Sequence, residues 1–449
     1  MKLTKLFTFI STSILLTACS TQEVADNKTE KLPKNIIYMI GDGMSMAHLT
    51  AYRHYVNSSE QHIGLGNKVV PQTIFDEYFV GVASTLPDDD TLVTDSASSA
   101  TALASGEKTY NGAIGLDNDK STLTSILEHA KTKGMLTGTI STSQITHATP
   151  ASFLAHNESR NNQNEIADAI LDQHINNKVK ADLLLGGGTD YFIRDDRNLV
   201  DEFKQLGFSY YSELSQLNKM TQLPVLGLFA PKGLPYAIDS QDNPNRLLAM
   251  TKPALSLLNK NNPNGFFLMI EGSQIDWCSH SNDIACAMQE MEDFAQTLSA
   301  VIEFAKKDGN TLVVLTADHG TGGLSVGANK QYKWLPNVVH KVKASAGELV
   351  KSIFASKDIA KTWLDSTGFE LTSEQLTLVK ELKAQDKSKE LYGQVMKLIN
   401  DQSFTGWTTT GHVGDDVAVI AYGPQSNKFV GAQDNTDLAK KLLSYIKTK

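Results

Sequence analysis

Carboxylate and imidazole side chains recur in this chain where apolar runs end, or in loops close to those ends. The set comprises Asp42, Asp95, Glu271, Asp276, Asp318, His319 and His412. Taken singly, each residue has an ordinary interpretation as a turn aspartate, a helix cap or a loop histidine. Burying them together would cost free energy, because neighbouring carboxylates raise one another's pKa and each loses several kcal/mol of hydration. The set therefore predicts a site that holds divalent cations.

The segment EGSQIDWCSHSND contains the most specific spacing, with Asp276 and His280 four positions apart. One helical turn places both side chains on one face. A carboxylate oxygen and an imidazole nitrogen suit Zn²⁺, and His412 in TTTGHVGDD is the natural third ligand. A thiolate could also bind zinc, so Cys278 remains an alternative ligand.

Two further sets follow from ligand chemistry. Asp318 and His319 again combine a carboxylate with an imidazole. Asp42, Thr149 and Glu271 offer oxygen atoms only, which is the preference of Mg²⁺.

The stretch TDSA at 94–97 places Ser96 directly behind Asp95 at the head of an alanine-rich segment. Both residues are common helix caps. A serine at a helix N-terminus could also be a nucleophile, because free amides and the positive end of the helix dipole attract an anion there.

Apolar, β-branched runs alternate with helical patterns along the chain. The runs are NIIYMI, MLTGTIS, ADLLL, GFFLMI, TLVVLT and DVAVIAY. Helices are expected over 122–134, capped by Ser121, and over 284–308, stopped by Gly309. This alternation predicts an α/β fold with a large, mainly parallel central sheet between helices, whose working residues gather at the carboxyl ends of the strands.

The character changes over 321–405, where charged helical segments replace buried strands. Thr372 and Gln375 form a capping box there. We expect a helical insertion at 321–405 in a catalytic α/β domain made of 35–320 and 406–449. Trp334, Trp363 and Trp407 are interpreted as packing residues rather than a binding box.

The N-terminus carries two lysines ahead of a short apolar run that ends in LTACS. This pattern predicts a lipoprotein signal peptide over 1–18, with Cys19 as the lipidated residue, although a plain signal peptide is the alternative. Residues 19–34 then form a flexible tether. The protein is expected to be exported, in the periplasm or at the cell surface, and anchored by lipid to the outer membrane.

Cys278 and Cys286 would meet oxidising conditions after export. If one helix covered both, about 12 Å would separate them, so we expect free thiols. The net charge of −9 and the lack of long Lys/Arg runs argue against nucleic acid as a specific partner. An anionic substrate would then need metal ions or a placed arginine.

The chain resembles the alkaline phosphatases over nearly its whole mature length. The resemblance rests on seven segments in the family's order: IGDGMS, VTDSASSATALASGEKTYNGAIG, ITHATPASFLAHNESR, LLLGGGTDYF, EGSQIDWCSH, TADH and TGHVGDDVAVIAYGP. The pattern is similar to the bacterial branch that includes cold-active marine enzymes.

The resemblance implies a broad phosphate monoesterase with a phosphoserine intermediate at Ser96 and a phosphate clamp at Arg160. It also implies two Zn²⁺ and one Mg²⁺ per chain, and a homodimer. The implied ligands are Asp276, His280 and His412 for the first zinc, Asp42, Asp318 and His319 for the second, and Asp42, Thr149 and Glu271 for magnesium.

Three positions depart from the enteric bacterial pattern. His147 replaces an aspartate near magnesium, Trp277 replaces a lysine near phosphate, and Gly320 follows Asp-His where many relatives have Glu. His147 and Trp277 are therefore expected beside the substrate, with phosphate held more weakly.

Two alternatives remain open. A phosphodiesterase or sulfatase of the related superfamily is one, although sulfatases use C/S-x-P-x-R and Ser96 is followed by Ala-Ser-Ser-Ala. An exported phosphate-binding or metal-storage lipoprotein without turnover is the other.

Overall fold

The computed structural model describes residues 31–58, 72–240 and 242–448. The predicted signal peptide, Cys19 and most of the tether lie outside these residues. Within the described part of the chain, no helix combines the length and apolar character that crossing a bilayer requires.

A ten-stranded sheet forms the centre of the unit Leu32–Lys449. In spatial order its strands are β16 (Gly431–Asp434), β2 (Phe79–Ser84), β15 (Val417–Tyr422), β10 (Thr311–Ala317), β1 (Asn35–Gly41), β9 (Phe266–Gly272), β3 (Leu136–Gln144), β6 (Leu183–Gly187), β8 (Val225–Leu228) and β7 (Ser209–Tyr211). All six predicted strands are present. Every residue of β1, β9 and β10 is buried, as expected for strands covered on both faces.

One strand inside the sheet runs against the others. β15 pairs antiparallel with both β10 and β2, whereas the remaining neighbours pair in parallel. The N-terminal end of β15 therefore lies at the edge where the parallel strands have their carboxyl ends. The segment before β15 carries His412, so the reversal brings this residue to the same edge as Asp318.

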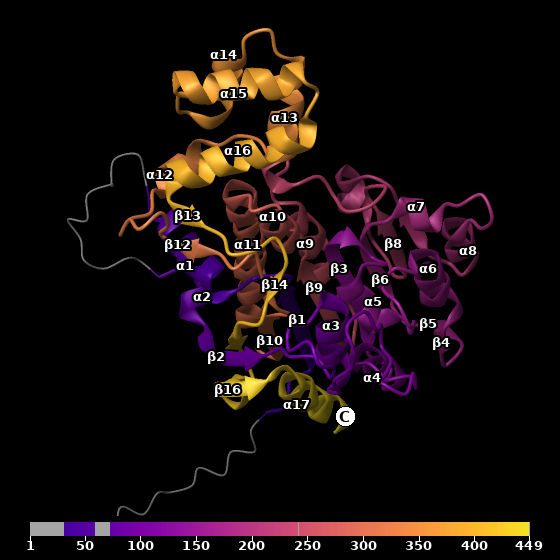
Figure 1. Cartoon of the computed structure of the whole chain (residues 1–449). Helices are drawn as coiled ribbons and strands as arrows, with labels where there is room; N and C mark the ends of the chain where they lie inside the picture. The colour runs from indigo at the N-terminus through magenta and orange to yellow at the C-terminus, as the bar shows by residue number, and fades with distance from the viewer. Residues whose placement is uncertain (1–30, 59–71, 241, 449) are drawn as a thin grey trace, which may run out of the picture. The chain divides into compact units, whose positions relative to one another are not determined.

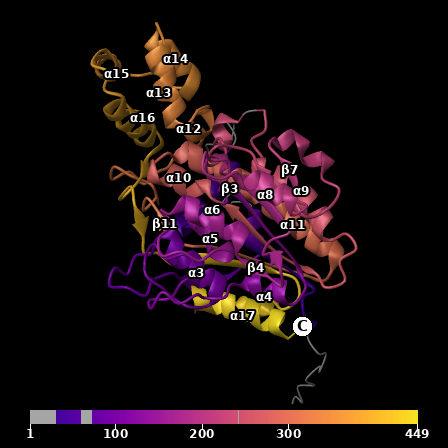
Figure 2. The ribbon, with the colours of Figure 1, turned by 90° about the vertical axis from the view of Figure 1, so that its right-hand side faces the viewer.

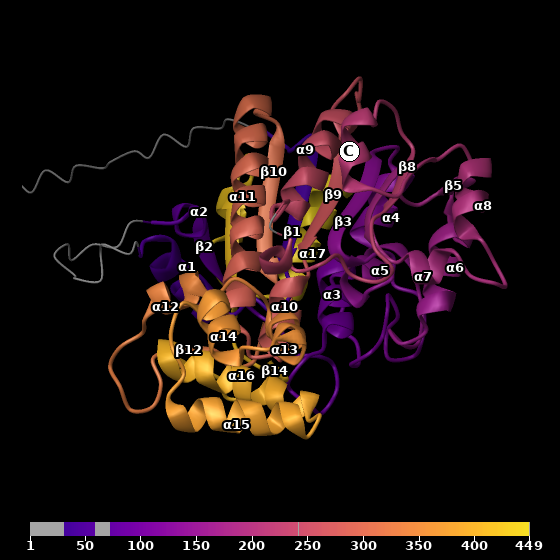
Figure 3. The same cartoon turned by 90° about the horizontal axis from the view of Figure 1, so that it is seen from above.

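Helices cover both faces of the sheet (Figure 2). One face holds α9 (Arg246–Leu258) and α11 (Ile284–Asp308), and the other holds α3 (Ser96–Ser105), α4 (Ile126–Thr132), α5 (Ala148–Leu154) and α17 (Asn435–Lys447). In the view from above, α11 and α9 run beside β10, β1 and β9 (Figure 3). The predicted α/β class, with a mainly parallel sheet between helices, is confirmed.

The other helices join or flank these layers. They are α1 (Met46–Val56), α2 (Ile74–Glu77), α6 (Gln163–Asp172), α7 (Thr189–Phe192), α8 (Leu199–Gln205) and α10 (Gln274–His280), with short 3-10 helices at Leu214–Lys219, Ala237–Asp239 and Ser426–Phe429. Short strand pairs are formed by β4 (His174–Ile175) with β5 (Lys178–Val179), by β11 (Gly320–Thr321) with β14 (His412–Val413), and by β12 (Ser325–Val326) with β13 (Thr405–Gly406).

Helix ends follow local chemistry, with one correction. α11 ends at Gly309, whose φ of 65° is the left-handed conformation that glycine adopts at a helix end. α4, however, is capped by Ser125 rather than Ser121 and begins at Ile126. Ser125 forms a capping box with Glu128, so the first four residues of the predicted 122–134 helix stay outside it.

Five helices occupy the segment between β12 and β13: α12 (Pro336–Lys341), α13 (Ala346–Ala355), α14 (Ile359–Thr367), α15 (Ser373–Ala384) and α16 (Ser388–Ser403). Figure 1 shows α13 to α16 grouped beyond one end of the sheet. The predicted Thr372–Gln375 capping box opens α15. Trp363 is fully buried, while Trp334 and Trp407 pack against the core, which agrees with a packing role for all three.

The prediction of free cysteines is wrong, because Cys278 and Cys286 form a disulfide with a Cα–Cα distance of 5.5 Å. The assumed continuous helix does not exist. α10 ends at His280, and a turn containing Asn282 at φ 53° reverses the chain before α11 begins. The backbone N–H of Asp283 donates to the carbonyl of Cys278 at 2.9 Å, which closes the turn. A bonded sulfur also removes Cys278 as an alternative zinc ligand.

Candidate active site

Three carboxylates meet at the carboxyl ends of adjacent central strands. Asp42 follows β1, Asp318 follows β10, and Glu271 is the penultimate residue of β9. In the register of the sheet, Gly41 lies opposite both Ala317 and Gly272. The three carboxylate residues are each adjacent in sequence to one of these paired positions, so their side chains start at nearly the same level of the sheet. Each of the three residues is 0% exposed. The sheet thus brings together residues that are far apart in sequence.

Asp42, Asp318 and His319 form the first group that could hold an ion. His319 Nε2 lies 3.5 Å from Asp42 Oδ1 and 3.2 Å from Asp318 Oδ2. The hydroxyl of Thr321 donates to Asp276, so it can accept from His319 Nδ1, 3.2 Å away. Nδ1 then keeps its proton, and the lone pair of Nε2 faces the two carboxylates.

Asp276, His280 and His412, the set predicted for the first zinc, lie close together. His280 Nε2 lies 3.3 Å from Asp276 Oδ2 and 3.1 Å from His412 Nε2, while His412 Nε2 lies 3.7 Å from Asp276 Oδ1. The Nδ1 atoms of the two histidines bond to the carbonyls of Thr410 and Thr94. Both Nε2 lone pairs therefore point at one space, an arrangement that a cation would satisfy. His319 also belongs to a group with Asp276 and His412.

The oxygen-rich set lies on the other side of Asp42. Asp42, Glu271 and His147 form a group, with His147 Nδ1 3.9 Å from Asp42 Oδ2. Thr149, near the start of α5, is fully buried and its hydroxyl has no hydrogen-bond partner. Arg160 donates to His147 Nε2 at 3.2 Å, which leaves the proton of a neutral ring on Nδ1. In that tautomer His147 would donate a hydrogen bond rather than bind a metal.

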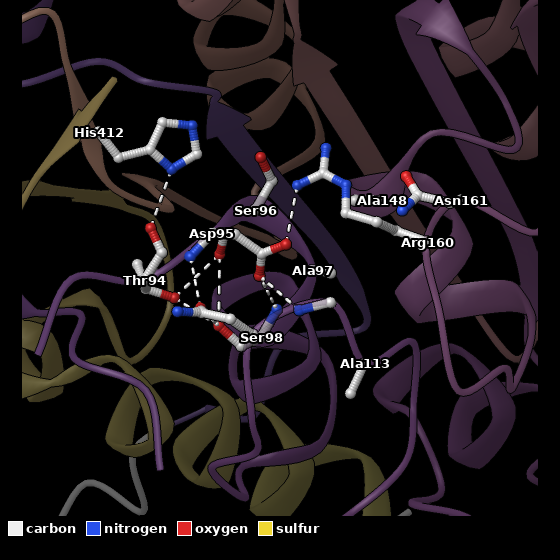
Figure 4. Close-up of polar contacts among 12 residues, drawn as sticks. Thr94, Asp95, Ser96, Ala97, Ser98, Ala113, Ala148, Arg160, Asn161 and His412 are labelled. Carbon is white, nitrogen blue, oxygen red and sulfur yellow. Dashed lines mark hydrogen bonds and ion pairs between the residues drawn. The ribbon is translucent and has the colours of Figure 1, made fainter. Parts of the chain in front are cut away.

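Ser96 is the first residue of α3 and is 1% exposed. The helix is capped by Asp95, which accepts from the backbone N–H of Ser98, so the cap in TDSA is the aspartate and not the serine. The Ser96 hydroxyl instead lies 3.1 Å from His319 Nε2. Figure 4 shows this hydroxyl between His412 and Arg160. Its place at the helix start, with free amides alongside, suits attack on a bound anion.

Arg160 faces Ser96 from a separate segment after α5. Its Nη1 donates to Asp95 Oδ2 at 3.0 Å (Figure 4). Its Nη2 donates to His147 Nε2, so both ends of the guanidinium are oriented. The ring of Trp277 packs edge-on against His147 at a centroid distance of 5.7 Å. His147 thus contacts both Arg160 and Trp277.

The proposed ligand residues fit bound cations because several of their buried oxygen atoms lack a hydrogen-bond partner. Buried atoms without a hydrogen-bond partner include both carboxylate oxygens of Asp42, Oδ2 of Asp318, Oε1 of Glu271 and the hydroxyl of Thr149. Burial first, and neighbouring carboxylates second, raise the pKa of Asp42 well above its usual range and that of Asp318 to about 8. Without a cation this cluster would have to bind protons; divalent ions would supply the missing charge and partners.

Sequence reasoning missed two supporting residues. Thr321 bonds both Asp276 and His319, and His48 is a fully buried histidine that bonds Ser279 in α10. A threonine two residues after the Asp-His pair in TADHGT was the only available signal for the first. His48 has no pattern of its own, because its partner lies 231 positions away.

Comparison with known proteins decides the family. A family model described as alkaline phosphatase matches residues 33–448. The chain belongs to the alkaline phosphatase family. It is 46% identical over 425 residues to alkaline phosphatase 3 of Bacillus subtilis (strain 168), covering 94% of this chain and 90% of that protein. As an alkaline phosphatase, the chain is a metal-dependent enzyme that hydrolyses phosphate monoesters.

Solved structures agree with this assignment. A cold-active alkaline phosphatase from a psychrophilic Shewanella is 43% identical, with a TM-score of 0.85, covering 92% of this chain and 99% of that one. The resemblance to the cold-active branch is thereby confirmed. The alkaline phosphatase of the Antarctic bacterium TAB5 is 29% identical, with a TM-score of 0.68 and coverages of 93% and 98%. A His-to-Glu mutant of the TAB5 enzyme (30% identical, TM-score 0.69) was solved with Mg bound in its M3 site.

Proposed function

We propose that this alkaline phosphatase works through a covalent phosphoserine at Ser96. The observation that supports this most directly is the place of the Ser96 hydroxyl, 3.1 Å from His319 Nε2 and opposite Arg160. The serine oxygen attacks phosphorus and the bond to the alcohol oxygen breaks, so that phosphoserine and the free alcohol form. Water then attacks the phosphoserine, the Ser96 Oγ–phosphorus bond breaks, and inorganic phosphate leaves.

Arg160 positions the phosphoryl group during both steps. Its planar guanidinium can donate to two phosphoryl oxygens at once, a geometry that lysine cannot reproduce. Asp95 and His147 hold that plane before the substrate arrives, which lowers the entropy lost on binding. Backbone amides at the start of α3 face the same oxygens.

The ligand sets support two Zn²⁺ and one Mg²⁺ per chain. We assign the mixed nitrogen and oxygen sets to zinc: Asp276, His280 and His412 in one site, and Asp42, Asp318 and His319 in the other. Asp42, Thr149 and Glu271, which offer oxygen only, are assigned to magnesium. When bound, the zinc ions would lower the pKa of the Ser96 hydroxyl and neutralise charge on the phosphoryl oxygens and the leaving oxygen.

The residues that would contact substrate all address the phosphoryl group. Ser96 and Arg160 recognise phosphorus and its oxygens, and His147 and Trp277 lie beside them. We therefore propose broad specificity toward small phosphate monoesters, because discrimination between alcohols would need groups that contact the alcohol.

Hydrolysis of 4-nitrophenyl phosphate tests the mechanism. Ser96→Ala should lose nearly all turnover, and acid-quenched parent enzyme should carry one phosphoryl group on the peptide containing Ser96. Ser105→Ala, at the far end of the same helix, is the matched control and should retain parental activity. Full activity in Ser96→Ala, or full activity after prolonged chelation, would contradict the proposal.

Export, lipid attachment at Cys19 and a homodimer remain proposals. The first two rest on the sequence of residues 1–19 and the third on the family resemblance. Membrane fractionation of the full chain against Cys19→Ala tests the anchor, with release of the variant into the soluble fraction as the expected result. Light scattering after size exclusion tests the dimer, which a monomeric mass would contradict.

A further inference from the structure

α10 carries two of the proposed zinc ligands but is only seven residues long. A helix of this length is unstable alone, so contacts with the rest of the protein must fix its position. Asp276 and His280 occupy one face of it. Cys278 lies on the opposite face and Ser279 next to the ligand face, because successive residues are 100° apart.

The disulfide restrains the face of α10 that points away from the metal. Cys286 lies in the first turn of α11, where its backbone N–H donates to the capping carboxylate of Asp283. α11 has 25 residues and packs along the sheet, so it is a rigid support. Both cysteines are 1% exposed. The bond therefore ties the ligand-bearing helix to a firmly held one.

His48 restrains α10 from a second direction. Its Nε2 lies 2.8 Å from the hydroxyl of Ser279, and that hydroxyl donates to the carbonyl of Ile275. The hydroxyl must then accept from Nε2–H, which leaves Nδ1 to accept from the backbone N–H of Ser45 at 3.2 Å. His48 and Ser279 are both 0% exposed, so water cannot replace either bond.

The same histidine links α10 to the segment that carries Asp42. Gly43 follows Asp42 directly and Ser45 lies three residues after it; a β-carbon added to Gly43 would lie 2.8 Å from the Cα of Asp276. The turn after β1 and α10 are thus in direct contact, with His48 bonded to both. A shift of α10 would move Asp276 and His280 away from His412.

We propose that His48, Ser279 and the Cys278–Cys286 disulfide are positioning residues for the metal ion held by Asp276, His280 and His412. This inference rests on the proposed metal assignment. Mutation of groups that hold metal ligands in place typically lowers metal affinity 10- to 100-fold. We expect changes in these groups to weaken binding of this ion only. The ion held by Asp42, Asp318 and His319 should be retained.

The test is zinc release from the loaded full chain into excess 4-(2-pyridylazo)resorcinol, followed by absorbance and counted per chain. Ser279→Ala and the double variant Cys278→Ser/Cys286→Ser should release one zinc about tenfold faster than the parent, with the second release unchanged. His48→Leu should behave like Ser279→Ala. His48→Gln, which can keep a donor near the position of Nε2, should recover part of the parental rate.

His340→Leu is the matched control. His340, like His48, forms a ring-nitrogen hydrogen bond to another segment, in its case to the backbone carbonyl of Tyr55, and it stacks on the Tyr55 ring. It joins α12 to the far end of α1 instead of contacting α10. Parental release rates in Ser279→Ala and the cysteine variant, or equal acceleration in His340→Leu, would overturn this inference alone. A parent that takes up no zinc would overturn the metal assignment as well. Ser279→Ala removes one hydroxyl only, so it keeps the test valid if larger changes prevent folding.

Discussion

At the carboxyl ends of β1, β9 and β10 the carboxylates are buried and each keeps at least one oxygen without a hydrogen-bond partner, whereas charged groups on α13 to α16 face water in pairs. Lys361 and Asp365 lie 2.5 Å apart on α14, with side chains 69% and 60% exposed. Lys351 and Glu348 form a similar pair on α13. Exposed pairs of this kind contribute little to stability, because water screens them and ordering long side chains costs entropy.

This difference in burial shows that the unfavourable electrostatic energy of the fold is concentrated at the sheet edge. The helices α13 to α16 can be stabilised by capping and apolar burial, as by the fully buried Trp363 on α14. The sheet edge cannot, because Asp42, Glu271 and Asp318 are each 0% exposed and keep oxygens without donors. Ligation should therefore dominate the stability and activity of the sheet edge and leave the helical group nearly unaffected.

Asp42→Asn should produce the largest effect. The change keeps the volume but removes the carboxylate shared by two proposed metal sites, so activity should fall on the order of a thousandfold or more. Metal content and turnover of 4-nitrophenyl phosphate measure this. Asp293→Asn is the control, since Asp293 is buried too but is held by Arg246 and the backbone of Leu247. Equal loss in both variants would remove the distinction between ligated and internally paired carboxylates.

Trp363→Ala should give the converse result. The side chain is 0% exposed and packs edge-on against Phe369 at 5.5 Å, so its loss should cost about 3–5 kcal/mol in the unfolding of the helical group. At urea concentrations below the unfolding transition the variant should keep its activity, because no proposed ligand lies on these helices. Urea unfolding followed by circular dichroism, with activity measured in parallel, checks both parts. Loss of activity before any unfolding would show that the two regions are coupled.

The central strands could be predicted because burial on both faces demands continuous apolar runs, as in NIIYMI and TLVVLT. The strands β2, β7, β8 and β16 could not. They have three to six residues, and β2 and β16 are partly exposed, so they lack such runs.

The residues proposed as ligands could be selected from the sequence because carboxylates and imidazoles follow the strand ends, and their proposed grouping came from the family resemblance. The disulfide was not, since the reversal at Asn282 depends on one left-handed residue inside an otherwise helical pattern. His48 was not either, because a single hydrogen bond across 231 positions leaves no periodic trace. Supporting contacts therefore need the tertiary structure, whereas ligand types do not.

Glu128 is a third kind of carboxylate, buried like those at the sheet edge but paired with basic groups of the protein. Burial alone would raise its pKa, but the hydrogen bond from His156 and the charge of Lys180 outweigh burial and lower the pKa to about 2. The Lys180 Nζ lies 2.8 Å from its Oε1. A depressed carboxyl pKa stabilises the fold above the unfolded value of 4.5 and loses that contribution as pH falls toward 2.

The parent should therefore lose about 3 kcal/mol of unfolding free energy from this group between pH 4.5 and pH 2. Glu128→Gln should be less stable at pH 7 and should lack this part of the acid dependence. Urea unfolding of metal-free protein at pH 6 and pH 3 measures the difference. Asp365→Asn, from the exposed pair on α14, should leave both values unchanged. An equal acid dependence in parent and Glu128→Gln would show that the buried pair does not carry it.

Trp277→Lys should produce the smallest change, because it alters the rim of the site rather than its ligands. Trp277 lies against His147, which in turn accepts a hydrogen bond from Arg160, so a lysine there would add a positive charge near bound phosphate. We expect the inhibition constant of inorganic phosphate to fall several-fold, with a lower kcat if product release then limits turnover. Trp277→Phe keeps an aromatic ring without the charge and should leave phosphate inhibition near the parental value. Equal inhibition constants for the lysine and phenylalanine variants would mean that weak phosphate binding arises from groups other than Trp277.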